Sequence, residues 1–242
     1  MKQNLIKLIL IYTCLQATIY ANTSNKTIKL NKDITTKISS NFYNIQTGTK
    51  NYDFPTEVSI TPKTTGIKIN FKNDGSKFVY QNDNTTNNSE LYDQEVFEVF
   101  IHSGDKVSNQ YFEFELNPNA ALFNAYIKKA GKEAYFLDAS SQSNDKTTKH
   151  TTYNKLAWQV TKDSQKGSFS GELFIPYSLI NKSQCYRANF LRIASYTDHS
   201  EEKNWKCNIN TCSYLAFNPT YSTTFHIPDK MVILDIDSNN LV

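Results

Sequence analysis

Acidic side chains fall at alternate positions in two neighbouring apolar segments. Glu98 lies in EVFEVFI (residues 95–101), and Glu113 and Glu115 alternate with apolar residues in YFEFELN (residues 111–117). Alternation with a period of two is typical of a strand that has one apolar and one polar face. The two segments therefore predict an antiparallel pair of strands whose polar face carries carboxylates. Such a face can hold polar ligands.

Clustered carboxyl groups allow two kinds of chemistry. A glycosidase needs two of them at a defined distance, one with a raised pKa, and Glu98, Glu113 and Glu115 can meet that need on adjacent strands. The simpler expectation is a polar network that binds without reaction. The sequence contains no serine or cysteine nucleophile motif and no glycine-rich phosphate loop. Binding is the main prediction, and glycoside hydrolysis is the alternative.

Arg192 is the basic residue of most interest. It lies in the alternating segment FLRIASY (residues 190–196). Its planar fork of donors suits vicinal hydroxyl groups as well as carboxylates. We expect Arg192 either to reach into a cleft or to pair with Glu98, Glu113 or Glu115 across neighbouring strands. The two roles are compatible, because a paired arginine can also bind a sugar.

The remaining elements are predicted to be short strands joined by polar turns. Residues 57–71 predict two strands around a Pro-Lys-Thr-Thr-Gly turn, and residues 156–160 and 168–175 predict another antiparallel pair. Further strands are expected at 78–80, 120–127, 190–196, 225–227 and 231–236, one helical turn at 177–180, and polar loops at 82–89, 136–154 and 200–210. The predicted fold class is all-β, a two-sheet antiparallel β-sandwich.

The first 21 residues resemble an export signal. Two lysines precede a short apolar run, and Ala21 is a small residue at a suitable cleavage point, with Ala17 as another. We therefore predict a signal peptide over residues 1–21, a single domain over residues 22–242, and a secreted or periplasmic protein; an uncleaved anchor is the alternative. No later segment is apolar for long enough to form a membrane helix, so no membrane contact is expected after cleavage.

Charge and cysteine content narrow the partners further. The net charge of +3 falls to about +1 without the two lysines of the leader, and the other lysines are scattered, so no nucleic-acid partner is expected. Cys185, Cys207 and Cys212 remain after cleavage, and Cys207–Cys212 is the nearest pairing for a disulfide. A pairing of Cys185 with either of the others stays open. Three cysteines without a fourth ligand make a zinc site a weak alternative.

Five segments, taken together and in order, resemble carbohydrate-binding module family 9, within the wider DOMON-like group of jelly-roll β-sandwiches. They are LYDQEVFEVFI (91–101), YFEFELNPNAALFNAYI (111–127), GELFIPYSLI (171–180), YRANFLRI (186–193) and LAFNPTYSTTFHIPDKMVILDI (215–236). The resemblance implies a non-catalytic protein that binds mono-, oligo- or polysaccharides. In such modules two aromatic side chains enclose a sugar, and carboxylate, arginine and amide groups bond its hydroxyls.

Sugar recognition also needs flat apolar side chains that stack on the C–H groups of a pyranose. Tyr92 and Phe217 stand where the resemblance often places tryptophan, and Trp205 lies in the charged loop EEKNWKC, where it either contacts ligand or packs on the base of the loop. Trp158 is expected in the core. The predicted carbohydrate-binding residues are Tyr92, Glu98, Glu113, Arg192, Trp205 and Phe217; Asn117 and Asn124 could add amide contacts, although Asn117 is better placed to cap its Asn-Pro turn.

The resemblance suggests two further kinds of ligand, haem and calcium. Other DOMON-like domains bind haem through methionine and histidine, so a haem-binding domain is the second alternative function, with Met231 and one of His102, His150, His199 and His226 as ligands. Family members often carry structural calcium, for which acids near strand ends are candidates: Asp93, Glu95, Asp235 and Asp237. The binding function itself requires no cofactor.

Overall fold

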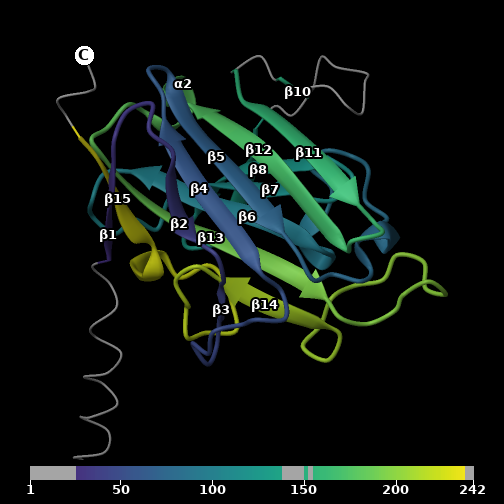
Figure 1. Cartoon of the computed structure of the whole chain (residues 1–242). Helices are drawn as coiled ribbons and strands as arrows, with labels where there is room; N and C mark the ends of the chain where they lie inside the picture. Colours follow the sequence, from purple (N-terminus) through teal and green to yellow (C-terminus); the bar gives the residue numbers. More distant parts are fainter. Residues whose placement is uncertain (1–25, 138–149, 152–154, 238–242) are drawn as a thin grey trace, which may run out of the picture.

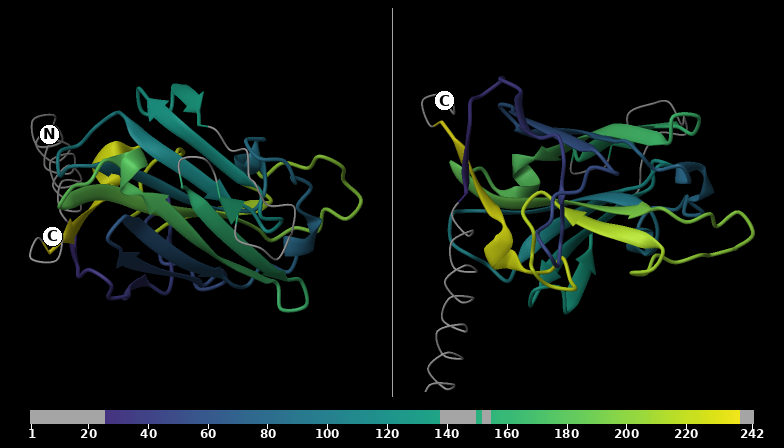
Figure 2. Two further views of the ribbon diagram at one scale, coloured as in Figure 1. Left: turned by 90° about the horizontal axis from the view of Figure 1, so that it is seen from above. Right: turned by 60° about the horizontal axis from the view of Figure 1, so that its bottom comes forward.

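Two β-sheets stack face to face and enclose an apolar core (Figure 1). The structure is a computed structural model that describes residues 26–137, 150–151 and 155–237. The predicted signal peptide lies outside these residues, as does most of the loop expected at 136–154. The two layers are also apparent in the turned views of Figure 2. The prediction of an all-β, two-sheet sandwich is therefore confirmed.

The larger sheet has nine strands in the part of the chain that is described. Its main path runs β1-β15-β13-β6-β7-β8-β9, and β14 pairs with the end of β13 and with β3. The strands are β1 (Thr27–Leu30), β3 (Tyr43–Asn44), β6 (Val96–Ser103), β7 (Tyr111–Leu116), β8 (Leu122–Lys128), β9 (Glu133–Phe136), β13 (Cys185–Ser195), β14 (Cys212–Ala216) and β15 (Val232–Ile236). All pairs in this sheet are antiparallel except β1–β15, which is parallel and lies at its edge.

The smaller sheet has six strands in the order β10-β11-β12-β5-β4-β2. They are β2 (Thr36–Ser39), β4 (Thr56–Pro62), β5 (Gly66–Asn73), β10 (His150–Thr151), β11 (Ala157–Asp163) and β12 (Ser168–Pro176). One helical turn, α2 (Tyr177–Ile180), follows β12 as predicted, and three 3-10 turns complete the elements: η1 (Val79–Gln81), η2 (Leu91–Asp93) and η3 (Pro228–Lys230). No helix among the described residues is long and apolar enough to cross a membrane.

The core between the sheets contains the apolar sides of the alternating strands. Phe97 of β6 stacks on Phe71 of β5, with ring centroids 4.2 Å apart. Phe114 of β7 and Phe190 of β13 point into the same space, and so does Trp158, which is fully buried as predicted. A second buried apolar cluster covers the outer face of the larger sheet, on the side away from the smaller sheet.

Three local predictions differ from the structure. Residues 78–80 belong to a 3-10 turn, closed by the hydrogen bond from the Gln81 amide to the Phe78 carbonyl, and not to a strand. Residues 225–227 form no strand, because the Ile227 amide bonds back to the Phe225 carbonyl immediately before the η3 turn. Several short strands were also missed: no strand was predicted for β2, β3, β9 or β14, and β10 falls within the predicted loop 136–154. Strand β14 depends on its pairing with β13.

The strand registers decide where the acidic residues lie. Glu98 of β6 stands opposite Glu115 of β7, and Phe100 stands opposite Glu113. These side chains share the outer face of the larger sheet, while Phe97 and Phe114 face the core, as the alternation predicted. The acids are therefore gathered on one surface in the middle of the sheet.

Candidate functional site

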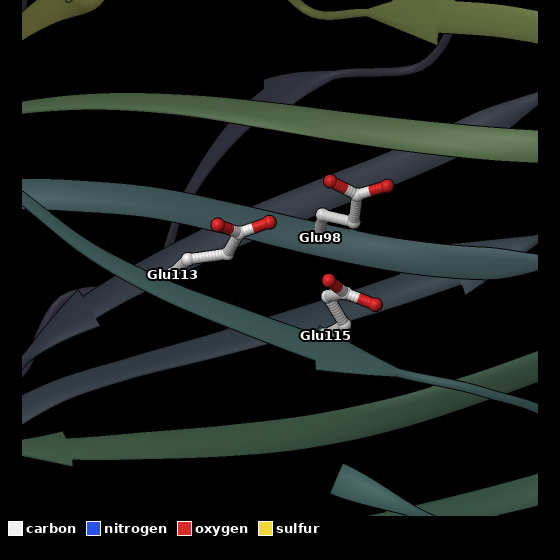
Figure 3. A group of neighbouring side chains, drawn as sticks. All are labelled: Glu98, Glu113 and Glu115. Carbon is white, nitrogen blue, oxygen red and sulfur yellow. The ribbon is translucent and has the colours of Figure 1, made fainter. Parts of the chain in front are cut away.

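Three glutamates form a compact cluster on the outer face of the larger sheet. Oxygen atoms of Glu98, Glu113 and Glu115 all lie within 4.8 Å of one another, and Figure 3 shows the three side chains next to each other on β6 and β7. Each residue is 5% exposed or less. The cluster is thus a patch of titratable groups that water scarcely reaches.

Burial makes ionisation of this acid cluster costly. Loss of hydration is the main cause that raises the pKa of Glu113 to about 7. It also raises the pKa of Glu98 well above its ordinary value, and the nearby Glu113 carboxyl adds to this. The pKa of Glu115 rises well above its usual range for the same reasons, with repulsion from both neighbours. At neutral pH the cluster therefore holds protons, so it can donate as well as accept hydrogen bonds.

The acid cluster is incompletely paired within the protein. Oε1 of Glu98 has no hydrogen-bond partner among the described residues. Unpaired buried polar atoms normally cost about 1–3 kcal/mol each, so they are rare without a functional reason. The cluster therefore has hydrogen-bonding capacity left over for a ligand.

A cleft of about 450 Å³ opens above Glu98 and Glu113. One of its walls contains three aromatic rings, Tyr92 from η2, Phe123 from β8 and Phe136 from β9. The rings meet edge to face, with centroids 6.0 Å apart for Tyr92–Phe123 and 5.5 Å apart for Phe123–Phe136. Tyr92 is 43% exposed and Phe136 is 62% exposed, so their faces are open to a ligand.

A second aromatic wall lies on the other side of the glutamates. Tyr214 of β14 packs against Phe225, with ring centroids 6.1 Å apart, and Thr223 and Thr224 extend this wall. In the sheet order β14-β13-β6-β7-β8-β9, the acid-bearing strands lie between the two walls. The arrangement suits a flat ligand with apolar faces and polar edges.

His226 closes one end of the cleft. Its Nδ1 is 2.6 Å from the Tyr111 hydroxyl, and its ring stacks on Phe100 at 5.2 Å between centroids. Burial lowers the pKa of His226, so the ring is neutral near pH 7. His226 therefore adds a polar edge to the cleft and no positive charge.

A larger hollow of about 870 Å³ lies elsewhere, around the loop after β6 and the inner-facing side of β8–β9. Its lining mixes Asp105, Lys106 and Lys128 with aromatic residues, and the acid cluster is not part of it. We place the candidate site in the smaller cleft because unpaired buried acids and two aromatic walls converge there.

The predicted residues divide into two groups. Tyr92, Glu98 and Glu113 line the cleft. Arg192, Trp205 and Phe217 do not, and each is buried. The structure therefore brings three of the six predicted residues together and places the other three elsewhere.

Arg192 lies behind the cleft, between the two sheets. Its Nη2 is 3.0 Å from Oε1 of Glu95, and its Nη1 donates to the Asp74 carbonyl at 2.9 Å. The expected pairing with Glu98, Glu113 or Glu115 is thus wrong, because Arg192 points to the opposite face of the sheet. Its neighbour Leu191, which stands opposite Glu98, is the residue that faces outward.

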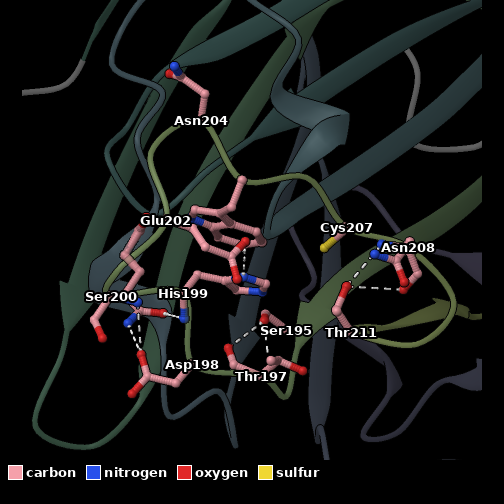
Figure 4. Close-up of polar contacts among 12 residues, drawn as sticks. Ser195, Thr197, Asp198, His199, Ser200, Glu202, Asn204, Cys207, Asn208 and Thr211 are labelled. Atoms are coloured by element: carbon pink, nitrogen blue, oxygen red, sulfur yellow. Dashed lines mark hydrogen bonds and ion pairs between the residues drawn. The ribbon is translucent and has the colours of Figure 1, made fainter.

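Trp205 is 3% exposed and supports a loop. Its Nε1 donates to the Gln81 carbonyl at 2.8 Å, and its ring stacks on His199 at 4.1 Å between centroids. The loop between β13 and β14 also contains internal hydrogen bonds, including Ser200 to Asp198 and His199 to Glu202 (Figure 4). Trp205 therefore takes the second role expected for it, packing at the base of its own loop.

Phe217 is also 3% exposed, and it belongs to the core between the sheets. Its ring lies 6.1 Å from that of Phe190 and 6.4 Å from that of Phe42, centroid to centroid. Its aromatic surface is used for packing and does not face the cleft.

The disulfide predicted between Cys207 and Cys212 is present, with a Cα–Cα distance of 5.4 Å. Cys207 lies at the edge of the cleft, and its amide donates to the Asp93 carbonyl at 2.6 Å. Lys206 pairs with Asp93 at 2.5 Å and with Glu90 at 3.3 Å. The loop is thereby fastened beside Tyr92. Cys185 is a free thiol.

The acids expected as calcium ligands are not gathered together. Asp93 pairs with Lys206, Glu95 with Arg192, and Asp235 with Lys29. Among the described residues, Glu98, Glu113 and Glu115 form the group whose oxygens are close enough to share an ion. Any calcium proposal therefore moves from the predicted acids to this cluster.

The residues expected for haem do not form a suitable pair. Met231 is buried in the outer apolar cluster, and the Nδ1 of His226 is occupied by Tyr111. His199 is stacked on Trp205, and His102 bonds the Ser103 carbonyl. His150 is described only in its backbone. These observations do not fit a haem site.

Asn117 has the capping role that was expected. Its Oδ1 accepts hydrogen bonds from the amides of Asn119 and Ala121 at 3.1 and 3.0 Å. Asn124 lies on the strand positions that alternate with Phe123 and faces away from the cleft. Neither amide is placed to contact a ligand there.

Sequence reasoning missed most of the aromatic lining of the cleft. The residues not predicted are Phe123, Phe136, Tyr214, Phe225 and His226. A signal existed for Phe123, because it alternates outward in LFNAYI, on the strand beside Glu115. The others come from a strand or loop that only the tertiary structure brings to the glutamates.

Solved structures of other proteins share this fold. A candidate carbohydrate-binding protein from Bacteroides uniformis superposes with a TM-score of 0.57 over 88% of this chain and 99% of its own, at 13% identity. A family 9 carbohydrate-binding module from Caldicellulosiruptor kristjanssonii, in complex with cellotriose, gives a TM-score of 0.53 over 90% and 97%, at 9% identity. The chain has the fold of a family 9 carbohydrate-binding module. The module from the same organism in complex with glucose gives 0.51 over 88% and 96%, at 7% identity.

The amino-acid sequence shows only distant similarity to known proteins. No protein-family model matches the chain. An extracellular protein of Arthroderma benhamiae is 26% identical over 137 residues, which make up 54% of this chain and 58% of that protein. The match thus spans less than two thirds of that relative. The likeness to family 9 modules concerns the fold, and the function must be argued from the cleft.

Proposed function

We propose that this chain is an exported, non-catalytic carbohydrate-binding protein whose ligand occupies the cleft above Glu98 and Glu113. One observation carries the proposal. Two aromatic walls flank buried acids, and Oε1 of Glu98 has no hydrogen-bond partner among the described residues. Proteins of this fold in complex with cellotriose and glucose support it.

Each part of the cleft has a role in this proposal. The open faces of Tyr92 and Phe136 stack on the C–H groups of a pyranose, and Tyr214 and Phe225 face its other side. Glu98 and Glu113 bond hydroxyl groups at the floor of the cleft. Because their pKa values are raised, they can act both as donors and as acceptors, which is what a hydroxyl-rich ligand needs.

Export and the absence of catalysis are parts of the same proposal. A disulfide and an extracellular relative support an exported protein. Binding without catalysis is favoured because the solved proteins of this fold in complex with cellotriose and glucose are carbohydrate-binding modules.

Titration calorimetry with a panel of neutral mono- and oligosaccharides tests the proposal. We expect saturable binding of at least one sugar, weakened about tenfold by Phe136→Ala, since one lost stacking contact is worth about 1 kcal/mol or more. Tyr135→Ala is the matched control, because Tyr135 is exposed on the same strand but faces the other side of the sheet.

Two simple assays separate the alternatives. Release of reducing sugar from the bound ligand, lost in Glu113→Gln, would replace the binding function with hydrolysis. A Soret band after incubation with haem would favour a haem-binding domain. Failure of every sugar and insoluble polysaccharide to bind would reject the proposed function.

A further inference from the structure

We propose that the cleft selects sugars with a protonated amino group, such as glucosamine units, over neutral and acidic sugars. The inference deepens the proposed function and depends on it, since it assigns the ligand class of the same cleft. It is carried by the balance of charge around the cleft, the unpaired acid at its floor and the aromatic walls.

The charge in the cleft is one-sided. Asp93, Glu98 and Glu113 line it, and Glu115 lies directly beside them. Among the described residues that line the cleft, none is a lysine or an arginine. Lys206, the nearest basic residue along the loop, is held by Asp93 and Glu90. Asp93 is therefore compensated by Lys206, whereas none of the described residues that line the cleft is a cation that could compensate Glu98 or Glu113.

The basic group that could have compensated the acids is turned away. Arg192 is paired with Glu95 on the other face of the sheet. The other charged or titratable groups that face the cleft are Tyr92, Tyr214 and His226. Burial favours the neutral form of all three, so a cation has to come from the ligand.

An ammonium group can supply the hydrogen bond and the positive charge that the protein does not provide at Glu98. Glu98 lines the cleft and is 1% exposed, and its Oε1 has no hydrogen-bond partner among the described residues. An ammonium offers three donors and one positive charge, and it lets a neighbouring carboxyl group give up its proton. The neutral hydroxyl of glucose can supply the hydrogen bond but not the charge.

The walls favour the same ligand. Ring faces carry negative electrostatic potential, so a cation close to Tyr92, Phe136 or Tyr214 is attracted in addition to any stacking. A uronic acid would instead bring a carboxylate into a cleft where no described lining residue is a lysine or an arginine, so its charge would lose hydration without a counter-charge. The aromatic walls and the acidic floor of the cleft therefore both favour an amino sugar over an acidic sugar.

The test compares three trimers of similar shape with the full chain. Calorimetric titrations at pH 6 use a glucosamine trimer, an N-acetylglucosamine trimer and cellotriose. We expect the glucosamine trimer to bind at least about tenfold more tightly than either neutral trimer. Titration in two buffers of different ionisation enthalpy should also show proton release, because the cluster ionises when the ammonium binds.

Substitutions assign the preference to the acids. Glu98→Gln and Glu113→Gln should reduce the preference to about threefold or less while cellotriose still binds, because the amide keeps the shape and loses the charge. Glu201→Gln is the matched control, since Glu201 is an exposed acid on the neighbouring loop. It should leave the preference unchanged.

The outcomes separate the two proposals. Equal or tighter binding of cellotriose overturns the amino-sugar preference and leaves the carbohydrate-binding function standing. Tight binding of calcium that abolishes the preference also overturns it, because the cluster would then hold a metal ion. If no neutral, cationic or acidic sugar binds, the proposed function itself fails.

Discussion

Arg192 and Glu95 form an ion pair of 3.0 Å in the closed space between the two sheets, with side-chain exposures of 0% and 2%. Glu95 also accepts a hydrogen bond from Ser76, and Arg192 donates to the carbonyl oxygens of Pro55 and Asp74. The pair thereby connects strand β13 to the ends of β4 and β5 in the opposite sheet. The arginine that the sequence offers as a ligand is part of the structural core.

Arg192→Met should therefore destabilise the protein severely without changing the cleft. Removing one partner of a buried ion pair costs about 3–5 kcal/mol, because the other charge stays buried and unpaired. Thermal unfolding should show a lower melting temperature, and the double variant Arg192→Met/Glu95→Met should recover much of the loss. Sugar affinity of the folded fraction should stay at the wild-type value; a selective loss of affinity at unchanged stability would contradict this role.

Tyr92 should contribute to binding more than Trp205 does. Tyr92→Ala removes an exposed ring from the wall of the cleft and should weaken sugar binding by about fivefold to tenfold, with little effect on the melting temperature. Trp205→Phe should show the reverse pattern, because it loses the hydrogen bond to the Gln81 carbonyl inside the loop. Calorimetry and thermal unfolding of both variants measure the contrast, which fails if Trp205→Phe alone abolishes binding.

The acid cluster should make the protein less stable as the pH rises. The pKa of Glu113 is about 7 in the folded state and near 4.5 when unfolded, so between these values the folded protein binds more protons. The free energy of unfolding should therefore fall from pH 5 to pH 8, by on the order of 3 kcal/mol for this group alone. Thermal unfolding at a series of pH values measures the slope.

Glu115→Gln tests the origin of that slope. Glu115 is fully buried, and its pKa is raised by loss of hydration and by repulsion from Glu98 and Glu113. The variant should melt several degrees higher than wild type at pH 8 and nearly equally at pH 5, since about 1 kcal/mol corresponds to about 2–4 °C in a chain of this size. The exposed Glu201→Gln should reproduce the wild-type slope. Stability that rises with pH in wild type would contradict the buried cluster.

Reduction of the Cys207–Cys212 disulfide should affect both stability and binding. Opening so short a loop costs about 2 kcal/mol in the chain-entropy account. Affinity should also fall, because Cys207 lies at the edge of the cleft and its amide is bonded to Asp93. The measurement is thermal unfolding and calorimetry with and without reductant, in a Cys185→Ser background that removes the free thiol. Unchanged affinity after reduction would show that the cleft does not need the fastened loop.

The alternation of β6 and β7 was sufficient to predict the acid-bearing surface. Each strand has bulky apolar residues on one side and glutamates on the other, so only one orientation can bury the apolar side against the second sheet. The same reasoning correctly predicted the sandwich, the hairpin of β4 and β5, and the helical turn after Pro176. Tyr92 was predicted from the resemblance to family 9 modules, in the segment LYDQEVFEVFI that leads into β6.

By itself, the sequence determined which residues share a face of a strand; only the tertiary structure decided which face of β13 meets the core. Strand β13 is buried almost throughout its length, so its alternation contains no polar side to mark the solvent. From the sequence alone, the Arg192 side chain could face either the cleft or the core. Its buried ion pair with Glu95 shows that it faces the core. Phe136, Tyr214 and Phe225 reach the glutamates from distant segments. Their convergence depends on strand order, because contacts between strands far apart in sequence are set by the packing of the whole sheet.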